Sequence, residues 1–108
     1  MAGKIARGEV RLCPFPTPDK TRPVVVLTRN SVIGYLNTAL VAPITSTIRD
    51  APSEVLLTED DGMKATCAVN LHNATVVSQQ RLGRRVTSLS DQRMAEICAA
   101  LRFSIGCD

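Results

Sequence analysis

The fold of this chain is decided by residues 20–27, KTRPVVVL, an apolar run with polar chemistry at its start. The run from Val24 to Thr28, almost entirely β-branched, predicts a strand that is buried on both faces. Pro23 stands where its missing N–H does least harm to such a strand. Arg22 comes directly before this proline, so a restricted backbone and a rigid strand fix where its guanidinium points.

A second apolar run, residues 41–47 with the sequence VAPITST, ends in three hydroxyl-bearing residues. We expect a strand over 39–45, in which Pro43 suggests an edge or a bulge. If the two strands pair antiparallel, the start of the first lies beside the end of the second. Arg22 then faces the hydroxyls of residues 45–47, an arrangement that can hold a phosphate. An ordinary Ser/Thr turn is the alternative for the hydroxyls alone.

The rest of the chain predicts further short strands and one long helix. We expect strands over 8–13, 53–57, 66–71 and 74–77, an acidic turn over 59–62, and helical turns within 30–38 and 78–83. Short strands at regular intervals followed by one helix predict a mainly β protein with a C-terminal α-helix. The expected architecture is a small, strongly bent β-barrel that the helix caps.

The C-terminal segment has the pattern of an amphipathic helix. Ser90 is suited to the N-cap position, and Asp91 lies in the positive first turn. Gly106 ends the helix at the C′ position. Apolar residues recur at spacings of three and four, which predicts one core-facing stripe. The stripe consists of Met94, Ile97, Cys98, Leu101 and Ile105.

Length and composition exclude several classes of protein. The 108 residues fit a single domain over 1–108, and 44% apolar with 21% charged residues is ordinary for a globular protein. No apolar run approaches the roughly 20 residues that span a bilayer, and the N-terminus lacks a signal-peptide core. We therefore expect a cytoplasmic protein without membrane contact. Its scattered cysteines and single histidine predict neither disulfides nor a metal site.

The distribution of charge favours an anionic partner. The formal net charge is +3, and arginine is the commoner of the two basic residues. Basic residues dominate up to residue 49, and a second basic cluster contains Arg81, Arg84 and Arg85. A guanidinium can bind a phosphate through two parallel hydrogen bonds. A solvated charged surface is the alternative interpretation.

Taken in order along the chain, these motifs resemble the MazF/PemK family of toxin endoribonucleases. The resemblance rests on residues 7–10 (RGEV), 20–27, 41–49, 52–56 (PSEVL), 68–71 (AVNL), 81–85 (RLGRR) and 101–107. It implies an SH3-like β-barrel that forms a homodimer. It also implies a sequence-specific ribonuclease that acts on single-stranded RNA (mRNA, tRNA or rRNA) without a metal or cofactor. A MazE-like antitoxin is the implied protein partner.

The resemblance assigns the family's catalytic arginine to Arg22 and its catalytic hydroxyl to Thr45. Without a metal, the RNA's own 2′-hydroxyl is the simplest nucleophile. Arg22 suits stabilisation of the charge on the phosphorane, with acid assistance to the leaving 5′-oxygen as a second role. A guanidinium stays protonated and is therefore a poor base. We expect Thr45 to donate a hydrogen bond to a phosphate oxygen.

The residue that acts as the general base is left undecided by these motifs. Family members often carry Asp where this chain has His72, and histidine gains and loses a proton near neutral pH. His72 is therefore a candidate base, with a structural histidine as the alternative. The expected RNA-binding residues are Lys20, Ser46, Thr47, Arg49, Asn70 and Arg81. The rival function is a binding module on the same barrel that inhibits a protein target without significant ribonuclease activity.

Overall fold

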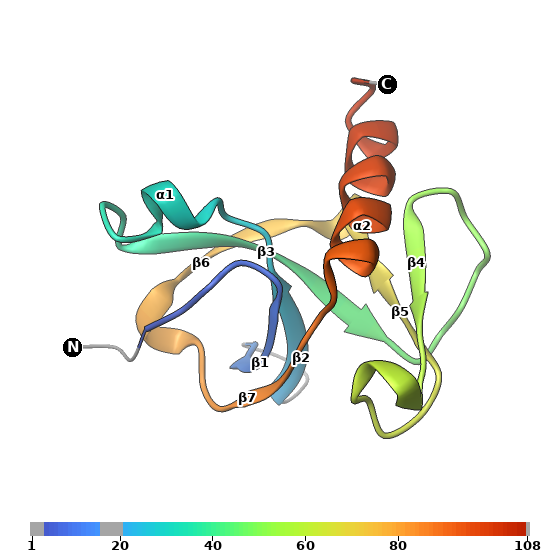
Figure 1. Ribbon diagram of the computed structural model, residues 1–108, viewed down its shortest axis with the longest axis horizontal. Helices are drawn as coiled ribbons and strands as arrows, with labels where there is room; N and C mark the ends of the chain where they lie inside the picture. Colours follow the sequence, from blue (N-terminus) through green and yellow to red (C-terminus); the bar gives the residue numbers. More distant parts are fainter. Residues whose placement is uncertain (1–3, 16–20, 108) are drawn as a thin grey trace.

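The computed structural model describes residues 4–15 and 21–107. Their elements are β1 (Glu9–Pro14), β2 (Thr21–Val26), α1 (Asn30–Ile33), β3 (Thr38–Thr45), β4 (Glu54–Leu57), η1 (Glu59–Asp61), β5 (Cys67–Asn70), η2 (Leu71–Asn73), β6 (Thr75–Ser78), η3 (Gln79–Arg81), β7 (Arg85–Ser88) and α2 (Asp91–Ser104). Figure 1 shows a bent sheet with α2 packed beside it. Within the described residues, no helix is long and apolar enough to cross a membrane.

Strand β3 is the central strand of the sheet. It pairs antiparallel with β2 on one side. The strands follow the order β4-β5-β3-β2-β1-β7, and β6 also pairs with β3. Of the two alternatives for Pro43, an edge or a bulge, the edge is therefore wrong. Pro43 lies between residues 38–41, which pair with β6, and residues 44–45, which pair with β5. The proline thus occupies the point at which β3 exchanges one partner strand for another.

Both faces of the β2–β3 pair are buried, as the apolar run in β2 predicts. Val24 and Val26 belong to one apolar cluster together with Val41 of β3. Val25 belongs to a second cluster together with Ala42, and this cluster includes the buried residues of α2. The alternation follows from the two-residue period of a strand. Each fully buried valine contributes about 1.5 kcal/mol or more to folding.

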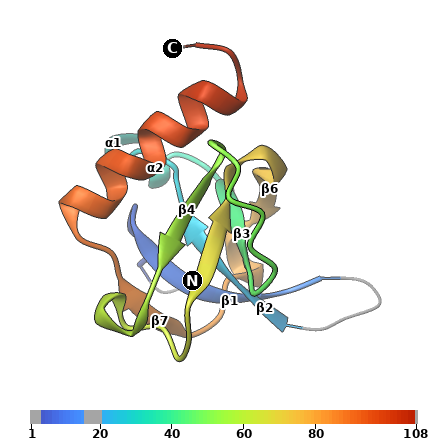
Figure 2. The same ribbon diagram turned by 90° about the vertical axis from the view of Figure 1, so that its right-hand side faces the viewer.

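Helix α2 begins and ends as predicted, but its apolar stripe is only partly buried. The Ser90 hydroxyl accepts a hydrogen bond from the N–H of Arg93 at 3.1 Å, and Gly106 has the positive φ of a C′ residue. Ile97 is 1% exposed, whereas Ile105 is 64% exposed. The predicted core stripe is wrong for the last turn because the helix continues past the strands there (Figure 2).

Strand β7 is missing from the sequence-based prediction. Only one of its four residues, Val86, is apolar, so no alternation marks the strand next to the basic segment. The strand forms because β1 offers a free edge, on which Glu9 lies opposite Ser88 and Arg11 opposite Arg85. Tertiary pairing, rather than local preference, creates this element.

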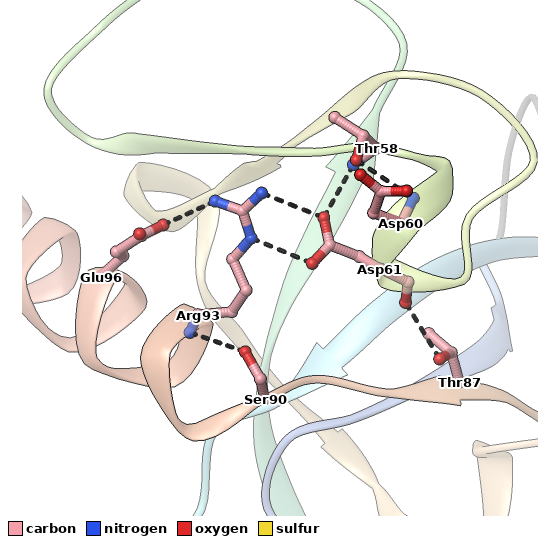
Figure 3. Close-up of polar contacts among 7 residues, drawn as sticks. All are labelled: Thr58, Asp60, Asp61, Thr87, Ser90, Arg93 and Glu96. Carbon is pink, nitrogen blue, oxygen red and sulfur yellow. Dashed lines mark hydrogen bonds and ion pairs between the residues drawn. The ribbon is translucent and has the colours of Figure 1, made fainter.

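A network of polar contacts ties the start of α2 to the turn after β4 (Figure 3). Asp61 accepts hydrogen bonds from Arg93 Nε at 3.0 Å and from Arg93 Nη2 at 3.2 Å. The N–H of Thr58 also donates to the Asp61 carboxylate, at 2.9 Å, and the Asp61 carbonyl accepts from the Thr87 hydroxyl. The hydrogen bonds from Arg93 are the main reason that the pKa of Asp61 lies below its usual value.

We expect Asp61→Asn to lower the free energy of unfolding at pH 7 by about 1 to 3 kcal/mol, because charged hydrogen bonds to Arg93 are lost. A carboxylate whose pKa is lowered by folding stabilises the protein above its unfolded pKa of about 3.9. That contribution disappears as the pH falls through the lowered pKa of the folded state. Urea denaturation at a series of pH values measures the difference between the two proteins.

The matched control is Asp60→Asn, since Asp60 is exposed and contributes its backbone N–H to the Thr58 hydroxyl. We expect this control to change the free energy of unfolding by less than about 0.5 kcal/mol. Equal destabilisation by both substitutions would contradict a stabilising role of the Asp61 carboxylate. So would a stability difference between wild type and Asp61→Asn that persists in acid.

Candidate active site

The pairing of β2 with β3 brings the start of β2 and the end of β3 to the same end of the sheet. Val24 lies opposite Pro43 in this antiparallel pair, so Arg22, two residues earlier, and Thr45, two residues later, both lie just beyond the last paired residues of the two strands. The antiparallel pairing predicted from the sequence is confirmed. Arg22 and Thr45 both line a cleft at this end of the sheet.

The cleft has a volume of about 650 Å³ and combines exposed polar residues with an apolar floor. Its polar lining consists of Arg22, Thr45, Ser46, Thr47, Lys64, Thr66 and Arg84. Its apolar lining consists of Leu12, Pro23, Ile44, Met63, Ala65, Cys67 and Val86. The described lining therefore offers cations and hydroxyls, without a carboxylate or an imidazole. Such a surface is suited to a phosphate with an apolar or aromatic group next to it.

A backbone hydrogen bond fixes the position of the Thr45 hydroxyl oxygen. The backbone N–H of Thr47 donates to Thr45 Oγ1 at 3.0 Å, which closes a turn directly after β3. Because the oxygen accepts this bond, the hydroxyl hydrogen can be donated to a group in the cleft. The Ser/Thr turn that sequence alone offers as an alternative is present, and it orients the hydroxyl.

The other predicted RNA-binding residues divide into two groups. Ser46 and Thr47 line the cleft beside Thr45. Arg49 and Arg81 do not line it, and the Arg81 guanidinium instead donates to the backbone carbonyl at the end of β1. Lys20 lies outside the described residues.

Strand β5 runs away from the cleft, so Asn70 and His72 lie toward its other end. Ala68 is the β5 residue opposite Thr45, and both predicted residues follow it along the chain. His72 Nδ1 is 2.5 Å from the hydroxyl oxygen of Ser53. Asn70 is 6% exposed, and neither residue lines the cleft. The role of His72 as the base stays a prediction.

Two cations in the cleft, Arg84 and Lys64, are missing from the sequence-based set. Arg84 belongs to the basic cluster at 81–85, and this cluster is the feature of the sequence that could have predicted its place in the site. Its carbonyl accepts a hydrogen bond from the N–H of Leu12 at 3.1 Å, which fixes its backbone beside β1. Lys64 follows an acidic turn and carries no comparable signal in the sequence.

Cys67 lies in the floor of the cleft and is 8% exposed. Burial raises the pKa of its thiol, and the charge of Asp61 adds to this effect, so the thiol stays protonated at neutral pH. Over the part of the chain that the structure describes, no group of three His, Cys, Asp or Glu side chains is placed to hold a metal ion.

The sequence matches a model of the family described as "PemK-like, MazF-like toxin of type II toxin-antitoxin system" over residues 6–105. A Mycobacterium tuberculosis (strain ATCC 25618 / H37Rv) protein named "Probable endoribonuclease MazF5" is 45% identical over 103 residues, which cover 94% of each chain. "Probable endoribonuclease MazF2" from Mycobacterium tuberculosis (strain CDC 1551 / Oshkosh) is 38% identical, covering 84% of this chain and 90% of that protein.

Solved structures show the same fold. "Mycobacterium tuberculosis toxin MazF-mt6" is similar with a TM-score of 0.84 and 28% identity, covering 93% of this chain and 98% of that chain. An "Endoribonuclease in complex with its cognate antitoxin from Mycobacterial species" has a TM-score of 0.86 at 21% identity, covering 97% and 98%. The predicted mainly β fold with a C-terminal helix is confirmed. The chain belongs to the family of PemK-like and MazF-like toxins of type II toxin–antitoxin systems.

Proposed function

We propose that this toxin cleaves single-stranded RNA in the cleft at the ends of β2 and β3, by attack of the 2′-hydroxyl on the scissile phosphate. The observation that carries the proposal is the cleft that Arg22 and Thr45 line together with further cations and hydroxyls. As a family member with a relative named an endoribonuclease at 45% identity, the chain is an endoribonuclease toxin. We infer that it acts in the cytoplasm on mRNA, tRNA or rRNA.

In the proposed reaction, O2′ attacks the phosphorus and the P–O5′ bond breaks, which leaves a 2′,3′-cyclic phosphate and a 5′-hydroxyl. The Arg22 guanidinium binds the non-bridging oxygens and stabilises the charge that builds on the phosphorane. The Thr45 hydroxyl donates to a phosphate oxygen, since its own oxygen already accepts from Thr47. The described cleft residues supply these contacts without the carboxylates that usually hold Mg²⁺.

We also propose that the chain forms a homodimer and is restrained by a MazE-like antitoxin with an acidic segment. The related mycobacterial endoribonuclease is described in complex with its cognate antitoxin. Exposed cations in the cleft are complementary to acidic side chains. Val76 on β6, and Phe103 and Ile105 near the end of α2, are large apolar residues that stay exposed and suit an interface between copies.

We expect Arg22→Ala to lower kcat by about 100-fold or more, because a charged donor to the transition state is lost. Thr45→Val should lower kcat by about tenfold, as expected for one hydrogen bond. A long single-stranded RNA is incubated with each protein in EDTA, and the cut ends are mapped. Wild-type protein should produce discrete 2′,3′-cyclic phosphate ends.

The control for Arg22→Ala is Arg29→Ala, because Arg29 is also exposed but lies before α1, outside the cleft lining. This control should cut at the wild-type rate. Absence of cleavage by the wild-type protein at any concentration, with growth arrest in cells, favours the binding-module function instead.

The geometry also yields an expectation for His72. Because His72 lies outside the cleft lining and contacts Ser53, we expect His72→Gln to leave the pH dependence of cleavage unchanged. The measurement is the single-turnover rate between about pH 5 and 9, a range that covers the titration of histidine. Loss of the acid limb in this variant would instead support the role of base predicted from the sequence.

Arg84 and Arg81 form a matched pair, since both are exposed and the Arg84 side chain alone of the two lines the cleft. We expect Arg84→Ala to weaken RNA binding and to reduce the salt dependence of log Kd by about 0.7, the value for one phosphate contact on a single strand. Arg81→Ala should change neither. Fluorescence anisotropy with a labelled RNA at several salt concentrations measures both quantities, and the reverse order of effects would refute the placement.

A further inference from the structure

Breaking the P–O5′ bond requires a proton for the leaving oxygen, and few described groups in the cleft can supply one. The two guanidinium groups of Arg22 and Arg84 hold their protons strongly, which makes them good electrostatic partners but weak acids. The Cys67 thiol is buried in the floor. Lys64 carries an ammonium group with three transferable hydrogens, and it is exposed at the cleft.

The backbone before Lys64 is held by the network around Asp61. The Thr58 hydroxyl accepts from the N–H of Asp60 while the Thr58 N–H donates to the Asp61 carboxylate, and Arg93 holds that carboxylate from α2 (Figure 3). Gly62 follows with φ of 94°, and a Cβ at this position would collide with the Thr87 hydroxyl. Only glycine therefore allows this close approach of the turn to β7.

The backbone after Lys64 is held by strand β5. Cys67 begins this strand and lies opposite Leu57, and Ala68 pairs with Thr45. Lys64 thus belongs to a short connection anchored at both ends, and the later anchor is the pair partner of Thr45. This placement keeps Lys64 in the lining of the same cleft as Arg22.

We propose that Lys64 is the general acid of the cleavage reaction. This inference rests on the proposed function and assigns one of its two proton transfers. As O2′ bonds to phosphorus and the P–O5′ bond breaks, a proton moves from Lys64 Nζ to O5′, which leaves as the 5′-hydroxyl. The neutral amine regains a proton from water before the next turnover. The proton of the 2′-hydroxyl leaves separately, to a base or to water.

A leaving-group substitution distinguishes this role from simple attraction between Lys64 and the RNA. Replacing the bridging O5′ by sulfur at the mapped cut site creates a leaving group that needs no acid. A thiol has a pKa of about 8.5, far below that of an alcohol, so a thiolate departs unprotonated. The charge, shape and binding contacts of the RNA remain nearly unchanged.

The experiment compares single-turnover cleavage of the oxygen and sulfur substrates by wild-type protein, Lys64→Ala and Lys64→Arg. We expect both variants to cut the oxygen substrate about 100-fold more slowly than wild type, a typical contribution of general acid catalysis. Both should cut the sulfur substrate at the wild-type rate. Arg22→Ala should stay slow on both substrates, and Lys4→Ala, an exposed lysine outside the cleft, should behave as wild type.

Other outcomes overturn the assignment. Equal slowing of both substrates by Lys64→Ala shows a role in binding or charge stabilisation, and full activity of Lys64→Arg on the oxygen substrate shows that charge alone suffices. Wild-type rates for Lys64→Ala on both substrates exclude any role. If wild-type protein produces no 2′,3′-cyclic phosphate ends, the proposed function itself fails and the inference fails with it. Circular dichroism melting of each variant confirms that it is folded.

Discussion

The antiparallel register between β2 and β3 is the constraint on which both the core and the cleft depend. Val24 opposite Pro43 sends alternate residues of both strands into two apolar clusters, so neither face of the pair is exposed to water. A slip by one residue would exchange the two faces and bury the wrong side chains. The same slip would separate Arg22 from Thr45. Burial of the valines therefore also selects the geometry of the phosphate site.

A contact between α2 and the turn after β4 also supports the cleft, although it does not line it. Arg93 on α2 binds Asp61, and this contact holds the turn from which residues 62–66 continue into β5. Precise placement of groups around a substrate depends on such supporting contacts. Helix α2 therefore does more than cover the core. Its first turn also sets the position of one wall of the cleft.

RNA cleavage needs both stabilisation of the charge on the phosphate and transfer of protons, and different residues of the cleft suit each task. Arg22 and Arg84 carry guanidinium groups, which bind phosphate oxygens through parallel hydrogen bonds and so serve electrostatic stabilisation. Proton transfer needs groups that release or accept protons more easily, and Lys64 is the described lining residue that fits the donor role. The acceptor role has no carboxylate or imidazole in the described lining of the cleft.

Much of the fold could be predicted because its signals are local. The buried strands, the Ser90 cap and the Gly106 stop each follow from a few neighbouring residues. Strand β7 and the exposed end of α2 could not be predicted, since the first depends on the free edge of β1 and the second on how far the sheet extends. The edge alternative for Pro43 failed for a similar reason, because a change of partner strand is not visible in one strand's sequence.

The apolar patterns and the ordered motifs were enough to predict the mainly β class and the family, and they made Arg22 and Thr45 candidates because both stand at ends of predicted strands. The folded structure was needed to show that Arg84, rather than Arg81, lines the cleft, that Lys64 joins it, and that His72 does not. These placements depend on pairings between residues far apart in the chain. Such pairings are set by the packing of the whole sheet, for which no short segment carries a signal.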